Sequence, residues 1–469
     1  MGGYFLGYVG VIMDISHGTT NEVRAGAVTP AAKLALWLIV VAYLVTSIAY
    51  NLAVPVGEAP DEPDHIGYVE ILMRTGELPT IPTGSPRYSY EAEQPPLYYF
   101  FQLAWMRLIW PNDELKPGLR ANPSFSFASD AVPNAYLHDY PPAQAVPVHL
   151  MRLLSTLFGL LTLIFVWLAA RTAWPEDGGV AVAAVGLTTF IPGFTFAAGT
   201  VSNDSLAAAF GAAITLALVY ILRRGVSMRA AILAGLAMGL GILSKRSLLV
   251  MLPLVTLVPL LSPSASRRAK WMGIGVILLL SVALGIWPFI SNIVEHGDPF
   301  ATEVTMQAKS SISSPLDKVP GFWLSPAYMM TLFNSFWGSF GLRSIDLPTW
   351  LYSIYYVLCG VALVGLVRRF RSMPATERWI GLVLVVVLLL VNAGVAYQNT
   401  QFWAVQGRLL LPGMAALALL VARGLSMLGG YILPFSARAR QIALVGLLAG
   451  LFALNWYALI WHILLVYYG

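Results

Sequence analysis

Long apolar runs recur along this chain, and polar residues gather in the segments between them. Each run is about 20 residues long, enough for one helix to cross a bilayer core of about 30 Å. Because no water reaches that depth, backbone groups must bond within the segment, as they do in a helix. The run 382–391 also lacks the alternation that membrane β-strands show. The pattern therefore predicts an all-α polytopic membrane protein.

Length and hydropathy together predict about eleven transmembrane helices. Two long loops, 55–148 and 291–348, interrupt the series. We treat 1–33 as a separate N-terminal segment and 34–469 as the transmembrane domain that includes both loops. The predicted spans lie near 34–54, 149–170, 179–199, 203–222, 229–244, 247–262, 271–290, 349–367, 379–397, 408–423 and 441–466.

Composition agrees with a membrane protein. Hydrophobic residues make up 58% of the chain and charged residues 11%, against roughly a quarter charged in soluble domains. The single cysteine, Cys359, excludes an intrachain disulfide. The net charge of +5 is modest and reflects basic loops, so no nucleic-acid partner is expected.

Basic clusters give the predicted bundle an orientation. All of them fall on one side of the span count, and the positive-inside rule makes that side cytoplasmic. The N-terminus is then cytoplasmic, and both long loops face the outside. We expect a multi-pass protein of the inner (plasma) membrane with an extracytoplasmic active site. The clusters are 223–224, 267–270, 368–371 and 438–440.

The first outer loop carries two predicted helices. The first, 64–74, is stopped by glycine and proline. The second, 95–110, is rich in tyrosine, phenylalanine and tryptophan, and is too short and too flanked by charge to span comfortably. We expect it to lie in the membrane interface, where aromatic side chains are well accommodated.

An acidic cluster directly follows the first span: Asp61-Glu62-Pro63-Asp64-His65. The proline places a helix start at or just after itself, so Asp64 is explained as a helix cap. Asp61 and Glu62 have no such explanation. Carboxylates here suit a general base or a divalent metal. The spacing matches no specific metal motif, so the base is favoured, while a divalent metal held by Asp61, Glu62 and His65 stays open.

Several basic residues break the positive-inside rule. Lys245, Arg246 and Arg408 fall on the outer side, at the depth where Asp204 begins a span. Paired structural charges at helix ends explain any one of them. The group as a whole indicates an anionic ligand, and a lipid phosphate is the anion available there. Transfer from a lipid-phosphate donor needs a base for the attacking hydroxyl and cations for the leaving phosphate.

Short motifs in a matching order and sidedness resemble the GT-C superfamily of membrane glycosyltransferases, particularly its protein-mannosyltransferase and aminoarabinose-transferase-like branch. The resemblance covers about residues 34–425 and implies a GT-C-type bundle with interfacial helices in the first outer loop. The motifs are Asp61-Glu62 with His65, 93–99 (EQPPLYY), 202–204 (SND), Lys245-Arg246, 336–341 (FWGSFG) and 406–412 (QGRLLLP).

The resemblance also implies a function. It implies a sugar donor linked to polyprenyl phosphate, inversion at the anomeric centre, and Asp61 as the base with Glu62 orienting the acceptor. Lys245, Arg246 and Arg408 are then the phosphate ligands. No large soluble domain is appended, which leaves a glycan, lipid or protein acceptor open. The further candidate substrate contacts are His65, Gln94, Tyr98 and Asp204.

Two other functions compete with this one. A transporter or flippase of an anionic lipid-linked substrate would use the same basic residues. Such proteins tend to carry mid-membrane charges and internal repeats, whereas these charges gather at one face and no repeat is evident. A lipid-diphosphate-dependent glycan polymerase or ligase would share the donor chemistry and differ in its leaving group.

Overall fold

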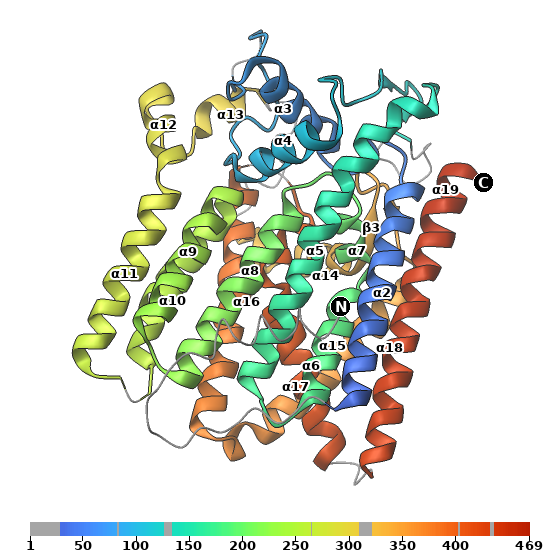
Figure 1. Ribbon diagram of the computed structural model, residues 1–469. Helices are drawn as coiled ribbons and strands as arrows, with labels where there is room; N and C mark the ends of the chain where they lie inside the picture. Colours follow the sequence, from blue (N-terminus) through green and yellow to red (C-terminus); the bar gives the residue numbers. More distant parts are fainter. Residues whose placement is uncertain are drawn as a thin grey trace.

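The computed structural model describes residues 29–81, 84–125, 134–263, 265–308, 321–401, 404–431 and 436–469. Long helices run side by side between two ends of a bundle, and α3 and α4 gather at one of these ends (Figure 1). We call this the α3–α4 end. Most of the predicted N-terminal segment lies outside the described residues, so that boundary stays a prediction.

Helices account for nearly all of the regular structure. The long ones are α2 (Pro30–Ala53), α5 (Val146–Ala173), α8 (Asp204–Arg224), α9 (Met228–Ser244), α11 (Arg267–Gly285), α15 (Thr349–Arg369), α16 (Ala375–Gln401), α17 (Met414–Tyr431) and α18 (Ala437–Leu459). The short ones are α3 (Glu62–Thr75), α4 (Leu97–Ile109), α6 (Gly178–Thr189), α7 (Pro192–Ala198), α10 (Leu252–Leu257), α12 (Trp287–His296), α13 (Thr302–Ala308), α14 (Pro326–Gly338) and α19 (Leu465–Tyr468).

Tighter turns and short strands complete the chain. The 3₁₀ segments include η1 (Pro142–Ala145), η2 (Arg246–Met251), η3 (Val258–Leu261), η5 (Phe322–Leu324), η6 (Phe370–Ser372) and η7 (Gly407–Gly413), and a π-helical turn, η8 (Ile460–Leu464), precedes α19. Two antiparallel pairs of two-residue strands join β1 (Arg120–Ala121) to β2 (Tyr136–Leu137) and β3 (Ser339–Phe340) to β4 (Ile345–Asp346).

The all-α polytopic class is confirmed, but the count of eleven spans is not. Within the described residues, eight helices are long and apolar enough to cross a membrane, or up to nine if the bent pair α6 and α7 is one span. That pair bends by 66° where Pro192 starts a new helix. Two other predicted spans, at α9 and at 246–261, are helical but short.

Burial separates central helices from peripheral ones. About three-quarters of the apolar window is buried in α8 (78%) and α17 (72%), against 22% in α2, α11 and α18. The central helices approach closely because small residues line them: a Cβ on Gly211 of α8 would meet the carbonyl oxygen of Pro412 at 2.1 Å. The peripheral helices present apolar side chains outward, as a lipid-facing layer requires; examples are Leu34 in α2, Leu279 in α11 and Val445 in α18.

Both helices predicted in the first outer loop are present, as α3 and α4, within two residues of their predicted bounds. They form a second hydrophobic core with the start of α5. Its most compact contact is the stacked pair Tyr68 and Tyr99, whose ring centroids lie 3.6 Å apart. The loop is thus a folded unit attached to the bundle, able to hold the acidic cluster in a fixed place.

Candidate functional site

The turn between α2 and α3 holds the acidic cluster in an unusual backbone conformation. Asp61 is the N-cap residue of α3, with a left-handed φ of 61°. Few residues other than glycine adopt this conformation, and aspartate is among those that tolerate it. The carbonyl of Asp61 accepts the backbone N–H groups of Asp64 (3.1 Å) and His65 (3.0 Å). Asp61, and not Asp64 as expected from the sequence, therefore occupies the cap position.

A chain of alternating charges links four of the predicted site residues. Arg408 donates through Nη2 to Asp61 and through Nη1 to Asp204, the latter at 2.7 Å. Lys245 donates through Nζ to the other oxygen of Asp204 at 2.5 Å. We call Asp61, Arg408, Asp204 and Lys245 the charge chain. It joins the start of α3, η7, the start of α8 and the end of α9.

A polar layer supports the charge chain. The side-chain oxygen of Asn203 accepts a bond from Lys245 Nζ at 2.9 Å, and its amide donates to Gln94 Oε1 at 3.3 Å. The hydroxyl of Ser202 donates to Asp204 at 3.0 Å. Gln94 is therefore connected to the charge chain through Asn203, and its contact with a substrate stays a prediction.

His65 lies close enough to the charge chain to interact electrostatically with all four of its members. The side chain is buried, and Nδ1 shares a 2.9 Å hydrogen bond with the hydroxyl of Tyr99. Burial lowers the pKa of His65 to about 4, against an opposing effect of Asp61, so the imidazole is neutral at neutral pH. Nε2 is also buried, and no described residue bonds to it. A buried ring nitrogen without a partner is a group that a bound ligand would satisfy.

Arg246 belongs to a different contact from its neighbour Lys245. Its guanidinium lies 3.9 Å from Glu93 Oε1 and donates to the carbonyl of Phe300 at 3.4 Å. Arg246 therefore does not share Asp204 with Lys245 and Arg408. Of the three predicted phosphate ligands, the structure brings together two.

Glu62 is committed to the protein interior. Its two oxygens accept Nε and Nη2 of Arg152 at 2.8 and 2.6 Å. They also accept the backbone N–H groups of Val201 (2.9 Å) and Gly57 (3.0 Å). Burial by itself raises the pKa of Glu62, but the charge and hydrogen bonds of Arg152 outweigh it and lower the pKa. Both oxygens are engaged, so we correct the expected acceptor contact: Glu62 fixes the turn that carries Asp61.

Sequence reasoning missed Arg152, the partner of Glu62. It lies in α5 with no exposed surface and also donates to the carbonyls of Asn51 (2.6 Å), Val54 (2.7 Å) and Pro55 (3.3 Å). These carbonyls end α2, so one guanidinium ties the end of α2 to the start of α3. The available signal was a lone arginine inside the predicted span 149–170, where a charge needs a partner.

Tyr98 also requires correction as a candidate substrate contact. Its ring is fully buried in the core of the outer loop. Its hydroxyl bonds to Ser155 Oγ at 3.1 Å and accepts Gln102 Nε2 at 2.9 Å. Helix phase explains the difference, because α4 turns Tyr98 inward against α5.

Close packing explains the glycine in the sequence Gln406-Gly407-Arg408. A Cβ on Gly407 would lie 1.9 Å from the backbone nitrogen of Phe336 in α14. The Gly407 N–H donates to Ser335 Oγ at 2.7 Å, and Arg408 Nε donates to Gln406 Oε1 at 2.6 Å. Gly407 thus lets η7 rest on α14, and that contact aims Arg408 at Asp61.

The sequence leaves open a divalent metal bound by Asp61, Glu62 and His65. Among the described residues, no group of three or more histidine, cysteine, aspartate or glutamate side chains is arranged to hold an ion. In particular, Asp61, Glu62 and His65 do not converge, because Glu62 turns to Arg152. A role for a divalent metal stays a prediction.

Comparison with solved structures shows which known fold the chain shares. The chain is similar to ArnT from Cupriavidus metallidurans bound to undecaprenyl phosphate, with 14% identity, a TM-score of 0.54, and coverage of 90% of this chain and 63% of that one. For apo ArnT the TM-score is 0.51, with 14% identity and coverage of 93% and 74%. Archaeoglobus fulgidus AglB also matches, with 14% identity, a TM-score of 0.48, and coverage of 92% and 55%. The two ArnT matches show that the fold is that of a GT-C-like membrane protein.

A family assignment follows from the sequence. The model of the family described as "Predicted membrane protein (DUF2142)" matches residues 143–420, more than half of the chain, so the chain belongs to that family. No curated protein matches the chain. The chain spans 63% of the length of the ArnT chain bound to undecaprenyl phosphate.

Proposed function

We propose that this protein is a glycosyltransferase that moves a sugar from a polyprenyl-phosphate-linked donor to a glycan, lipid or protein acceptor, with inversion at the anomeric carbon. The observation that carries the proposal is the charge chain at the α3–α4 end of a GT-C-like bundle. In it the accessible carboxylate of Asp61 contacts Arg408, and Asp204 joins Arg408 to the buried Lys245. The structural neighbour ArnT binds undecaprenyl phosphate, which supports the same class of carrier here.

Accessibility selects Asp61 as the base. Its side chain is 36% exposed, whereas the side chains of Glu62 and Asp204 are 0% exposed. A general base must come within hydrogen-bond reach of the proton that it removes. Of these three carboxylates, Asp61 is the one that an incoming hydroxyl can reach. Asp204 instead holds Arg408 and Lys245 in place.

The cations suit the leaving group. The acceptor oxygen forms a bond to the anomeric carbon while the bond from that carbon to the phosphate oxygen breaks, and the hydroxyl proton passes to Asp61. The electron pair of the broken bond leaves on the phosphate, where Arg408 and Lys245 stabilise the added charge. A bound phosphate also competes with Asp61 for the guanidinium of Arg408, which frees the carboxylate to accept the proton.

The position of the site supports a reaction outside the cytoplasm. The charge chain and the folded outer loop share the α3–α4 end, while the clusters 368–371 and 438–440 belong to the other end (Figure 1). Under the positive-inside rule the α3–α4 end is then extracytoplasmic, in an inner (plasma) membrane.

Replacing the base tests the proposal. The purified protein in liposomes would be given synthetic polyprenyl-phosphate donors with a panel of hexoses and pentoses, plus membrane glycolipids as acceptors. We expect Asp61→Asn to lower release of polyprenyl phosphate about 10²–10⁴-fold, with an unchanged thermal unfolding temperature. The matched control is Asp64→Asn, three residues away, which keeps most activity.

Two outcomes would contradict it. Full activity in Asp61→Asn removes the assigned base. Turnover of polyprenyl-diphosphate donors alone would assign the protein to the polymerase or ligase class instead, because the leaving group then differs.

A further inference from the structure

The imidazole of His65 has one ring nitrogen that is bonded and one that is not. Nδ1 shares a 2.9 Å hydrogen bond with the hydroxyl of Tyr99, whereas none of the described residues bonds to Nε2. His65 is 1% exposed, so bulk water does not replace the missing partner. A buried polar group without a partner is costly, and its presence beside a charged site indicates that a partner arrives in another state of that site.

The bond to Tyr99 decides which ring nitrogen carries the proton. The buried imidazole is neutral, so one nitrogen has a proton and the other has a lone pair. Among the described residues, the Tyr99 hydroxyl bonds to Nδ1 alone. If that hydroxyl donates to Nδ1, the Nε2 proton is the one group left unsatisfied. If Nδ1 donates instead, the hydroxyl proton and the Nε2 lone pair are both unsatisfied. The first arrangement is more stable, which makes Nε2 a hydrogen-bond donor.

Tyr99 holds the imidazole in a fixed orientation because its own ring is tightly packed. It stacks on Tyr68 with ring centroids 3.6 Å apart and ring planes within 2° of parallel. It also meets the ring of Tyr98 edge-on at 5.4 Å. The two nitrogens of an imidazole point in widely different directions, so a ring fixed through Nδ1 directs Nε2 away from Tyr99.

Two carboxylates of the charge chain are near enough to act on His65, and Asp61 acts more strongly than Asp204. Asp61 also lies one helical turn away, because its carbonyl accepts the backbone N–H of His65 at 3.0 Å. The Asp204 side chain is 0% exposed, and its two oxygens are held by Arg408 at 2.7 Å and Lys245 at 2.5 Å. Asp61 is therefore the acid that can turn toward Nε2.

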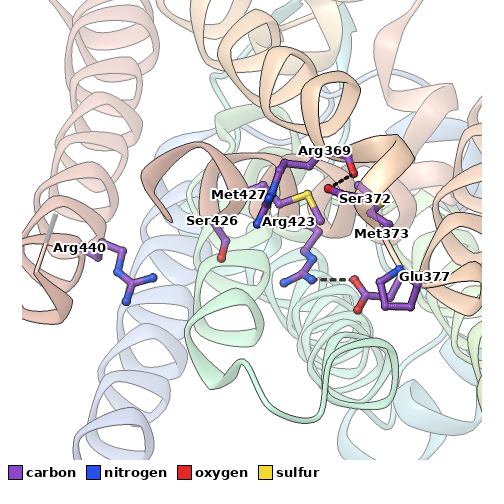
Figure 2. Close-up of a pocket in the computed structure, with 9 residues that line it drawn as sticks. Arg369, Ser372, Met373, Glu377, Arg423, Ser426, Met427 and Arg440 are labelled. Carbon is purple, nitrogen blue, oxygen red and sulfur yellow. Dashed lines mark hydrogen bonds and ion pairs between the residues drawn. The ribbon is translucent and has the colours of Figure 1, made fainter. Parts of the chain in front are cut away.

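The ion pair of Asp61 with Arg408 is easier to exchange than a second arginine pair of the bundle. In that second pair, Arg423 donates to Glu377 at 2.6 Å (Figure 2). The same Glu377 oxygen also accepts Trp174 Nε1 at 3.1 Å, and the Glu377 side chain is 14% exposed. The side chain of Asp61 is 36% exposed and makes no capping bond to the described helix α3. The Asp61 carboxylate can therefore turn once Arg408 is drawn away.

We propose that His65 is a positioning residue whose Nε2–H takes over the Asp61 carboxylate when a bound phosphate draws Arg408 away. The inference rests on the proposed function, in which the phosphate of the sugar donor competes with Asp61 for this guanidinium. Nε2–H holds one oxygen of Asp61, so the other oxygen is presented to the acceptor hydroxyl in a fixed direction. Because Nε2 has no exposed surface, the bound ligand satisfies it through Asp61 and not by direct contact.

A double-mutant cycle on the binding of synthetic polyprenyl phosphate tests the exchange without requiring transfer. Native mass spectrometry would measure the affinity of the purified full-length protein in a neutral detergent. We expect His65→Asn to weaken binding about fivefold, because the asparagine amide takes the place of Nδ1 and leaves no donor at the place of Nε2. His65→Gln, whose amide nitrogen reaches the place of Nε2, should bind nearly as the wild type does. In an Asp61→Asn background, this difference between the two variants should disappear.

Tyr99→Phe and Tyr98→Phe form a matched pair that leaves His65 itself unchanged. Each removes one buried hydroxyl from the same core, but the Tyr98 hydroxyl bonds to Ser155 and Gln102 and not to His65. Tyr99→Phe removes the bond that keeps the proton on Nε2, so it should weaken polyprenyl phosphate binding while Tyr98→Phe does not. This pair also covers a folding failure of His65→Asn, which a lowered unfolding temperature would reveal.

The pH dependence of sugar transfer separates positioning from a merely structural role. In the substrate complex, a bond from Nε2–H favours the ionised form of Asp61, so His65→Asn should move the acid limb of kcat to higher pH. The acid limb of kcat/KM reports the enzyme without substrate, in which Arg408 is the partner of Asp61, and it should stay in place. The other charged groups near His65, Lys245 and Asp204, are the same in the variant.

Two results would overturn the inference. One is equal weakening of polyprenyl phosphate binding by His65→Asn and His65→Gln in a folded protein. The other is an undiminished effect of His65→Asn in the Asp61→Asn background. The proposed function fails separately, if the coupling between positions 61 and 65 appears in binding but no sugar donor is turned over.

Discussion

Asp61 and Glu62 are adjacent carboxylates with opposite surroundings. Asp61 is partly exposed and meets Arg408, a residue 347 positions away, whereas Glu62 is fully buried against Arg152 and two backbone N–H groups. The left-handed φ of Asp61 produces the difference, because it turns one side chain outward at the residue before α3 begins. The two adjacent acids can therefore have different roles: Glu62 fixes the backbone of the turn, and Asp61 is available to react.

The largest expected effect comes from breaking the buried pair. Arg152→Met leaves the Glu62 carboxylate without its cation in the interior and releases three carbonyls at the end of α2. We expect a loss of about 3–5 kcal/mol of unfolding free energy, measured as a lowered thermal unfolding temperature and early proteolysis of the outer loop.

Two control variants show whether the loss of stability in Arg152→Met comes from the unpaired Glu62 carboxylate. Arg171→Met removes an arginine from the same helix that donates to the Pro175 carbonyl and is not fully buried, and it should cost less than about 1 kcal/mol. Adding Glu62→Gln to Arg152→Met removes the unpaired charge, so part of the loss should return. If Arg152→Met and Arg171→Met were equally stable, Glu62 would not be the fixed member of the two acids.

A smaller loss of stability should follow from disturbing the packing of η7 on α14, which positions Arg408, the partner of Asp61. In Gly407→Ala the new methyl group meets the backbone of Phe336, so η7 must move away from α14. We expect about 1–3 kcal/mol of destabilisation and, under the proposed function, a larger loss of transfer than of stability. Gly381→Ala in α16 is the control, because nothing lies within 4 Å of its added Cβ. An unfolding temperature and activity equal to those of Gly381→Ala would show that Arg408 does not depend on this contact.

The two helices of the first outer loop were predicted from the sequence because the residues that begin and end them lie within the helices or next to them. Proline and glycine mark the ends of α3, and aromatic residues mark α4, so both appeared near their predicted bounds. The span count depended on length and hydropathy, and α9 and the helical segment 246–261 are apolar but too short to meet the length criterion. A short apolar helix enclosed by neighbours has the same composition as a spanning one, which hydropathy cannot separate.

The site was predictable in part for a similar reason. Out-of-place charges put Lys245, Arg246 and Arg408 at the depth of Asp204. In the structure Lys245 and Arg408 contact Asp204, and Arg246 does not. Side-chain direction was not predictable: Lys245 and Arg246 are adjacent, yet the turn from α9 into η2 sends them to different partners. Helix phase likewise turned Tyr98 inward, and it is what brings Arg152 to face Glu62.

The smallest expected effect concerns Glu58, a third acid of the same turn, which is buried like Glu62 but has no arginine. Its oxygens accept the N–H groups of Ala135 (2.9 Å) and Tyr136 (3.0 Å), and burial raises its pKa to about 7. With the loop 134–138 released, Glu58 has its ordinary pKa near 4.5 and binds fewer protons than in the docked loop. Docking is therefore strongest below about pH 4.5 and weakens as the pH rises through 7.

Hydrogen exchange of 134–138, corrected for intrinsic rates, measures this docking between pH 5 and 8. We expect faster exchange at higher pH in the wild type. Glu58→Gln cannot ionise and should lose this rise, which leaves only the contribution of His138. Burial lowers the pKa of the adjacent His138, so its own contribution has the opposite sign, and His138→Asn should steepen the wild-type trend. Exchange that slows with rising pH would mean that Glu58 stays ionised like Glu62, and that the two backbone N–H groups hold this buried acid charged without an arginine.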